Sequence, residues 1–124
     1  APPEARIDDI VRARARHLGP EAQAMLAVAS VAGRPLPVDV AAHAAGVAAG
    51  HDAATRLSIE RLVTLRQVGA QALLHPAHDH IRVAILGGLS DEDRARWHAA
   101  LARAFEAAQG EGRRDGRIDG ATDT

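Results

Sequence analysis

Lysine is absent from this sequence, and all fifteen basic residues are arginine. A phosphate-binding P-loop uses a lysine to reach the β- and γ-phosphates, and a protein kinase needs a lysine on its third strand. Schiff-base chemistry also needs a lysine as its nucleophile. The chain alone is therefore predicted to have none of these activities and to bind no cofactor by itself.

Cysteine is absent too, and Trp97 and Phe105 are the only aromatic residues. The missing thiols exclude disulfides, thiolate catalysis and cysteine-type zinc sites. Hydrophobic residues make up 47% of the chain, and half of them are alanine. Because alanine has the highest helix propensity and allows close helix approach, the composition predicts a tightly packed helical core.

Long apolar runs are lacking, and the first residues, "APPEARIDDI", are acidic rather than typical of a signal peptide. We therefore expect a soluble, cytoplasmic protein without a membrane partner. The 124 residues match one domain in length. Sixteen acidic and fifteen basic residues give a formal charge of −1, which predicts no general attraction to nucleic acid.

Hydrophobic spacing, glycines and prolines divide the first part of the chain into helices. Gly33 and Gly46 are natural helix ends, and "RPLP" between them reads as a stiff connector. The helices are expected at about 3–17, 20–32, 39–45 and 53–68. The alternation in "VGAQALLHP" predicts one strand ending at Pro76, with 66–68 as its partner in a stubby hairpin.

The second part is predicted to hold two further helices, at about 77–86 and from Ser90 to Ala108. Ser90 precedes three acidic residues and suits an N-cap. The glycine-rich segment 109–124 shows no periodicity and is expected to be a disordered tail or linker. The residues expected to be largely buried are Leu26, Leu62, Leu65, Ile81, Ile85, Trp97, Leu101 and Phe105.

This order of elements predicts a mostly all-α fold, with a winged-helix-like helix-turn-helix core and a short β wing. Five or six helices and at most a two-stranded hairpin are expected. The expected divisions are a linking helix (1–18), the winged-helix core (19–76), a trailing helical hairpin (77–108) and the tail (109–124).

The stretch "HPAHDHIRVAIL" (75–86) holds the densest cluster of candidate site residues. His75, His78, His80 and Asp79 are of the types that bind zinc. On a helix, however, only residues three or four apart share a face, so these residues are predicted to form no metal site. No nucleophile motif accompanies them, so catalysis by a His/Asp pair is not expected either.

A helix-turn-helix also suggests DNA binding, with Arg56, Arg61 and Arg66 on the helix that would enter the major groove. Residues 38–68 carry these three arginines against three acidic residues, and three minus three leaves no net charge. Phosphate neutralisation dominates DNA affinity, so nucleic acid is an unlikely partner.

Three stretches together resemble the winged-helix segment of bacterial STAND (signal-transduction) ATPases and the related NB-ARC-like ATPases. They are "LGPEAQAMLAVASVAGRPLPVDVAAHAAGV", "SIERLVTLRQV" and "HPAHDHIRVAILGGLSDEDRARWHAALARAFEA". The family includes transcription regulators of the LuxR/maltose-regulator type and multidomain serine/threonine kinases with a fused ATPase. The resemblance covers roughly residues 4–108, and it depends on the order and spacing of the three stretches.

The resemblance implies a regulatory, protein–protein interaction module in signal transduction. Its partners would be an ATPase core and a helical-repeat domain of the same parent protein, which would bind ADP or ATP. The "AHD" at 77–79 stands where related proteins carry a nucleotide-sensing Met-His-Asp motif. His78 would contact the β-phosphate of ADP, and Asp79 would stabilise the helix start or the resting interface. The alternative is a free-standing winged-helix DNA-binding transcription regulator.

Overall fold

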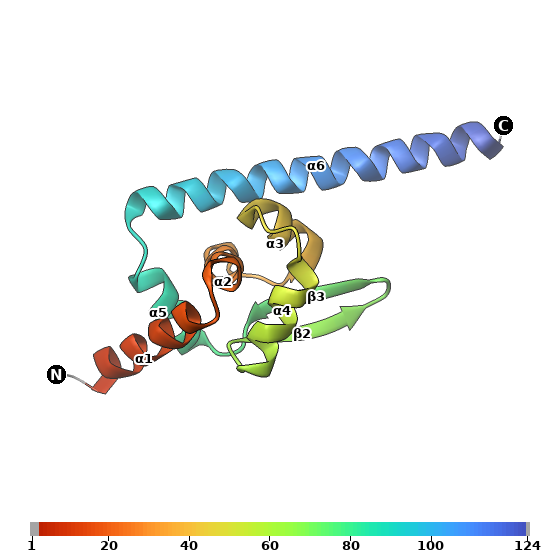
Figure 1. The fold of residues 1–124 in the computed structure, drawn as a ribbon. Helices are drawn as coiled ribbons and strands as arrows, with labels where there is room; N and C mark the ends of the chain where they lie inside the picture. The colour runs from red at the N-terminus through yellow and green to blue at the C-terminus, as the bar shows by residue number, and fades with distance from the viewer. Residues whose placement is uncertain (1–2, 124) are drawn as a thin grey trace.

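A computed structural model describes the backbone of residues 3–123 and the side chains of residues 7–110. Helices dominate it, and a small sheet lies to one side (Figure 1). The elements in chain order are α1 (Pro3–His17), α2 (Pro20–Ala32), β1 (Leu36–Pro37), α3 (Val38–Ala45), α4 (Gly50–Ile59), β2 (Val63–Val68), β3 (Gln71–Pro76), α5 (Asp79–Gly87) and α6 (Asp91–Asp123).

The sheet has three antiparallel strands in the order β1-β3-β2. The hairpin pairs Val63 with Pro76 at its base and Val68 with Gln71 at its tip. β1 adds only two residues, with Leu36 opposite Leu74. The expectation of at most two strands is therefore wrong, because the connector "RPLP" supplies a short third strand. A two-residue strand has no alternation of its own to reveal it.

The predicted helix 53–68 is also wrong in its second half. α4 ends at Ile59, and Arg61 adopts a left-handed backbone conformation with φ of 61°. The Leu62 amide donates to the Leu57 carbonyl at 2.9 Å, a bond typical of a helix end that turns back. The β-branched residues that follow, including Val63 and Thr64, favour the strand that forms there.

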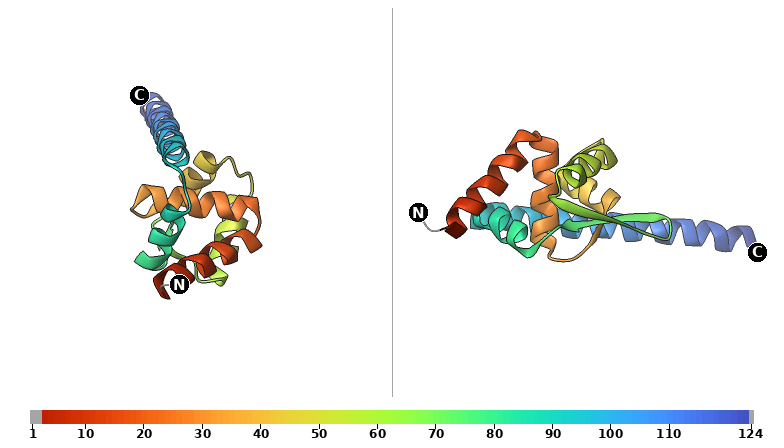
Figure 2. Two further views of the ribbon diagram at one scale, coloured as in Figure 1. Left: turned by 90° about the vertical axis from the view of Figure 1, so that its left-hand side faces the viewer. Right: turned by 90° about the horizontal axis from the view of Figure 1, so that it is seen from below.

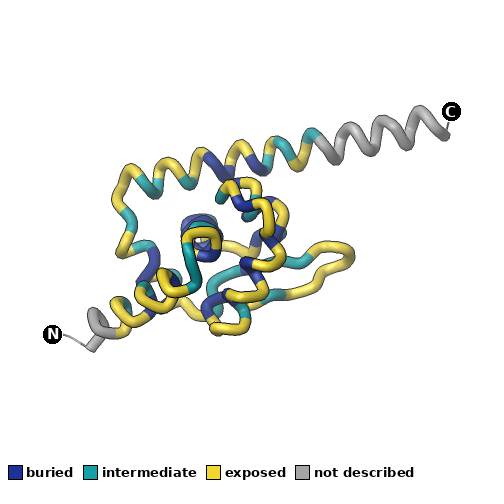
Figure 3. Tube along the Cα trace, viewed as in Figure 1, coloured by how far each residue is buried: buried dark blue, intermediate teal, exposed yellow. Residues whose placement is uncertain are grey.

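α2 is the centre of the core. Eight of its residues are buried, from Ala22 to Val31, and its path is the most continuously buried in Figure 3. Its contacts include all of the helices and β3. Of the side chains expected to be buried, Leu26, Leu62, Ile81, Ile85 and Leu101 are buried. Leu65, Trp97 and Phe105 are only partly buried against the same core.

α6 crosses α2 and α3 and continues beyond them (Figure 2). Its start matches the prediction, since the Asp93 amide donates to the Ser90 hydroxyl at 3.0 Å. Its backbone runs to Asp123, so the predicted end near Ala108 is not observed. Each glycine costs a helix only about 1 kcal/mol relative to alanine, and propagation from a formed helix is favourable. The side chains of residues 111–124 lie outside the described part.

α5 is tied to its neighbours by arginine side chains. Arg12 of α1 donates to the Ala84 carbonyl at 2.8 Å, and Arg94 of α6 donates to the Leu86 carbonyl at 2.7 Å. Arg82 of α5 donates to the Ser30 carbonyl of α2 at 2.9 Å. These bonds supplement a small apolar face of Ile81, Ala84 and Ile85.

Within the described residues, no helix is long and apolar enough to cross a membrane.

Candidate functional site

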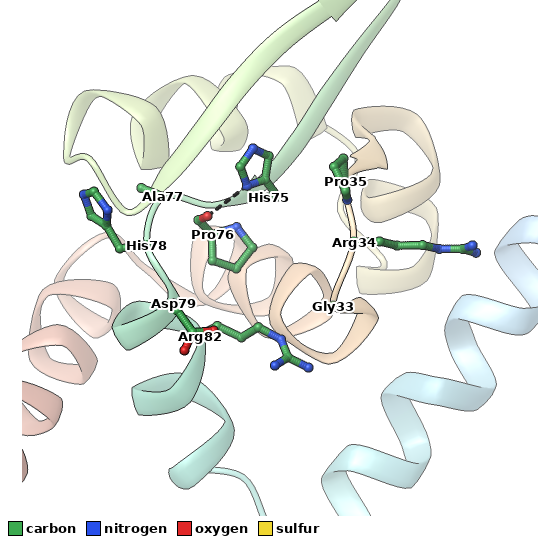
Figure 4. A pocket seen from close by; sticks show the side chains of 9 residues that line it. All are labelled: Gly33, Arg34, Pro35, His75, Pro76, Ala77, His78, Asp79 and Arg82. Carbon is green, nitrogen blue, oxygen red and sulfur yellow. Dashed lines mark hydrogen bonds between the residues drawn. The ribbon is translucent and has the colours of Figure 1, made fainter.

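The histidine-rich stretch borders a pocket of about 320 Å³. Two segments distant in sequence meet there: the residues that follow α2, and the stretch that leads from the end of β3 into α5 (Figure 4). The lining residues are Gly33, Arg34, Pro35, His75, Pro76, Ala77, His78, Asp79 and Arg82. The predicted site residues His78 and Asp79 therefore lie at the pocket, together with two arginines that the sequence did not single out.

Arg82 spans from α5 to the end of α2. Its Nε donates to the Ser30 carbonyl, which places a cation at the negative end of the α2 dipole. Gly33 lies directly beside it, in the left-handed conformation with φ of 67°. A Cβ on Gly33 would stand 3.1 Å from Nη2 of Arg82. Glycine here both ends α2 and leaves room for the guanidinium.

Arg34 follows Gly33 and extends toward α6 in Figure 4. Its guanidinium carbon stands 4.9 Å from the centre of the Phe105 ring, a distance typical of a cation–π contact. Arg34 also lines a second hollow of about 370 Å³, together with Ala32, His98, Leu101 and Phe105. One arginine thus borders both hollows.

His78 occupies the N-cap position of α5, with extended backbone angles of φ −144° and ψ 153°. Its ring stacks on that of His80, with centroids 5.4 Å apart and planes 9° from parallel. The helical-spacing argument against contact between these residues is therefore wrong, because His78 stands outside the helix. Asp79 opens α5, where a negative charge suits the helix dipole.

His75 lies apart from this pair. Its Nδ1 is 3.0 Å from the carbonyl oxygen of Pro76, and Figure 4 shows its ring and that of His78 on opposite sides of Ala77. Within the described residues, no group of three or more potential ligands could hold a metal ion. The His78 and His80 rings together offer two nitrogen-bearing groups, which is fewer than a structural zinc site requires.

The three arginines of the DNA-binding alternative lie on three different parts of the chain. Arg56 is on α4, within 3.6 Å of Asp52 and 3.4 Å of the Leu18 carbonyl. Arg61 occupies the turn after α4, and Arg66 is exposed on β2. Because the helix expected to carry all three ends at Ile59, they form no single helical face.

Arg34 and Arg82 are the pocket residues that sequence reasoning missed. Arg82 contacts a carbonyl 52 positions away, and Arg34 contacts a ring more than 70 positions away. Gly33 marked the end of α2 in the sequence, but nothing local marked either arginine as a pocket residue.

Comparison with known proteins found no matching family model, no matching curated protein and no matching solved structure.

Proposed function

We propose that this chain is a winged-helix regulatory and interaction module of a larger cytoplasmic STAND-type signalling ATPase. The support from the fold is the order of elements. A helix, a short strand, two helices and a hairpin follow one another as α2-β1-α3-α4-β2-β3, and the short strand pairs beside β3. This arrangement fits a winged helix with β2 and β3 as its wing, and α5 and α6 would lead toward a helical-repeat domain.

The observation that carries the functional part of the proposal is the position of His78 and Asp79. They stand at the start of α5, on a pocket that also contains Arg82. A helix N-terminus presents backbone N–H groups to anions, and imidazole adds a further donor. In the proposed parent protein, the ATPase core would hold ADP so that its β-phosphate reaches His78, while Asp79 would stabilise the resting interface.

α5 is also suited to pass on a change of nucleotide state. It contacts α1, α2 and β3, and Arg94 ties its end to α6. A shift of α5 upon loss of the phosphate would therefore reach α6, which leads away from the module. Coupling of this kind requires different contacts in the two states, and the phosphate supplies such a difference.

The chain without an ATPase core is expected neither to hydrolyse ATP nor to bind ADP at micromolar concentrations. It has no lysine and no P-loop, and one histidine at a helix end cannot replace them. Calorimetric titration with ADP and a phosphate-release assay with ATP measure both properties. Micromolar ADP binding by the 124-residue chain would contradict a site shared with another domain.

The alternative function, a free-standing DNA-binding regulator, is favoured by two exposed arginines, Arg61 just before the hairpin and Arg66 on its first strand. If they bind DNA, gel shifts should show a complex that weakens steeply as salt rises, because bound phosphates release counterions. We expect no complex beyond weak non-specific binding, since Arg56 is already paired with Asp52. A specific complex that is lost in Arg61→Gln and Arg66→Gln would favour the alternative and refute the regulatory module.

A further inference from the structure

We propose that the hollow of about 370 Å³ where α2 ends against α6 binds a small carboxylate with an apolar body, such as an arylalkanoic acid. We call it the α6 hollow, and its lining residues are Ala32, Arg34, His98, Leu101 and Phe105. It shares only Arg34 with the histidine-rich pocket and is otherwise lined by different residues. The inference goes beyond the proposed function and does not depend on it.

Apolar side chains form the floor of the α6 hollow. His98, Leu101 and Phe105 follow one another at spacings of three and four residues, so they lie on one face of α6. Leu101 is buried, whereas Phe105 and Ala32 are half-buried and can still contact a ligand. Sites for small molecules typically combine such an apolar lining with a few polar groups that fix the orientation of the ligand.

Arg34 is the polar group that would bind the carboxylate. Figure 4 shows its side chain extending from the segment after α2 toward α6, away from the histidine-rich pocket. Its guanidinium carbon lies 4.9 Å from the centre of the Phe105 ring, and this contact limits the positions of an exposed side chain. A group that is already ordered loses less conformational entropy when it binds. The guanidinium fork matches the two oxygens of a carboxylate, and the ring beneath it would contact the apolar body.

The charge of the α6 hollow favours an anion. No acidic residue lines it, and the exposed ring of His98 adds an N–H group at its edge. Four other arginines have a carboxylate within 4.0 Å, whereas none is found for Arg34 among residues 7–110. A cation above an apolar floor complements an anion that carries an apolar group.

The end of α2 beside the hollow would by itself disfavour an anion, because carbonyl groups at a helix C-terminus carry partial negative charge. Arg82 offsets this effect, since its Nε donates to the Ser30 carbonyl at 2.9 Å. The positive charge of Arg34 is therefore not required to stabilise this helix end and can serve a ligand.

The test is an NMR titration of the 124-residue chain with phenylpropionate at low salt. We expect saturable shifts of the amides of Ala32, Arg34 and Leu101, with a dissociation constant of about 1 mM. Phenylpropionamide has the same apolar body without the charge, and acetate has the charge without the body. Each should bind at least about tenfold more weakly, because the hollow recognises both parts together.

Three variants separate the contributions of the charge and the ring. Arg34→Gln should weaken phenylpropionate binding by at least about tenfold, because it removes charge-assisted hydrogen bonds. Phe105→Leu should weaken it between about twofold and tenfold, because it removes the aromatic contact. Arg103→Gln removes an exposed charge of α6 outside the hollow and should leave binding unchanged.

Thermal melting without ligand checks that each variant is folded, and the exposed Arg34 gives an independent test if Phe105→Leu is unstable. Absence of saturable shifts in the folded chain, or an unchanged dissociation constant in Arg34→Gln, would overturn the inference. Equal binding of phenylpropionamide would show that the charge is not recognised, and equal binding of acetate would show that the apolar floor is not used. Either result would also refute the proposed site.

Discussion

Replacing Leu62 with alanine is expected to lower the free energy of unfolding by about 2–5 kcal/mol, as for other fully buried leucines. Leu62 is 0% exposed and lies at the point where the chain turns from α4 into β2. Its amide donates to the Leu57 carbonyl at 2.9 Å, and its carbonyl accepts a bond from the Ala77 amide at 3.1 Å. A cavity there would loosen the packing of the helix end and the base of the hairpin together. Urea unfolding followed by circular dichroism measures the change.

The matched control is Ile59→Ala, three positions earlier. Ile59 is 71% exposed at the end of α4, so its truncation should change stability by less than about 0.5 kcal/mol. A loss below about 1 kcal/mol for Leu62→Ala, or equal losses for both variants, would show that the turn after α4 does not bury Leu62 as described.

The second large effect is expected from His78→Ala in the ATPase that we propose as the parent. A hydrogen bond to a charged group contributes about 1.5–3 kcal/mol, so loss of a contact made only in the ADP-bound resting state should shift the closed-to-open ratio by one to two orders of magnitude. ADP should dissociate faster, and the output should become active without inducer. Stopped-flow release of a fluorescent ADP analogue and an output assay measure these changes.

His43→Ala is a suitable control for this experiment. His43 is exposed on α3 and does not line the pocket. His75 and His80 are less suitable, because His75 borders the pocket and His80 stacks on His78. ADP release that is unchanged by His78→Ala, or changed equally by His43→Ala, would end the sensor proposal.

Helix ends and caps could be predicted from the sequence, because the type of a single residue determines them. Gly33 and Gly46 end their helices in the left-handed conformation, and Ser90 caps α6, as their residue types predict. The end of α4 was missed because Leu57, Leu62 and Leu65 fit a helical face as well as a strand. The strand forms because of tertiary contacts, since β2 pairs with β3 along its full length.

The site could be predicted only in part for a related reason. His78 and His80 are close in sequence, so their grouping at the start of α5 was visible in advance, whereas His75 lies apart on β3. β1, by contrast, exists only because Leu36 meets Leu74, and the pocket forms only because Arg82 reaches the end of α2. No local pattern marks partners that are 38 or 52 positions apart.

The three arginine bonds that fix α5 give this helix a particular sensitivity. Each joins a guanidinium to a main-chain carbonyl, so each depends on the angle at which two helices meet. Apolar contacts such as those of Ile81 tolerate a small slide, whereas directional bonds do not. The orientation of α5 therefore depends on these three directional bonds as well as on its apolar face.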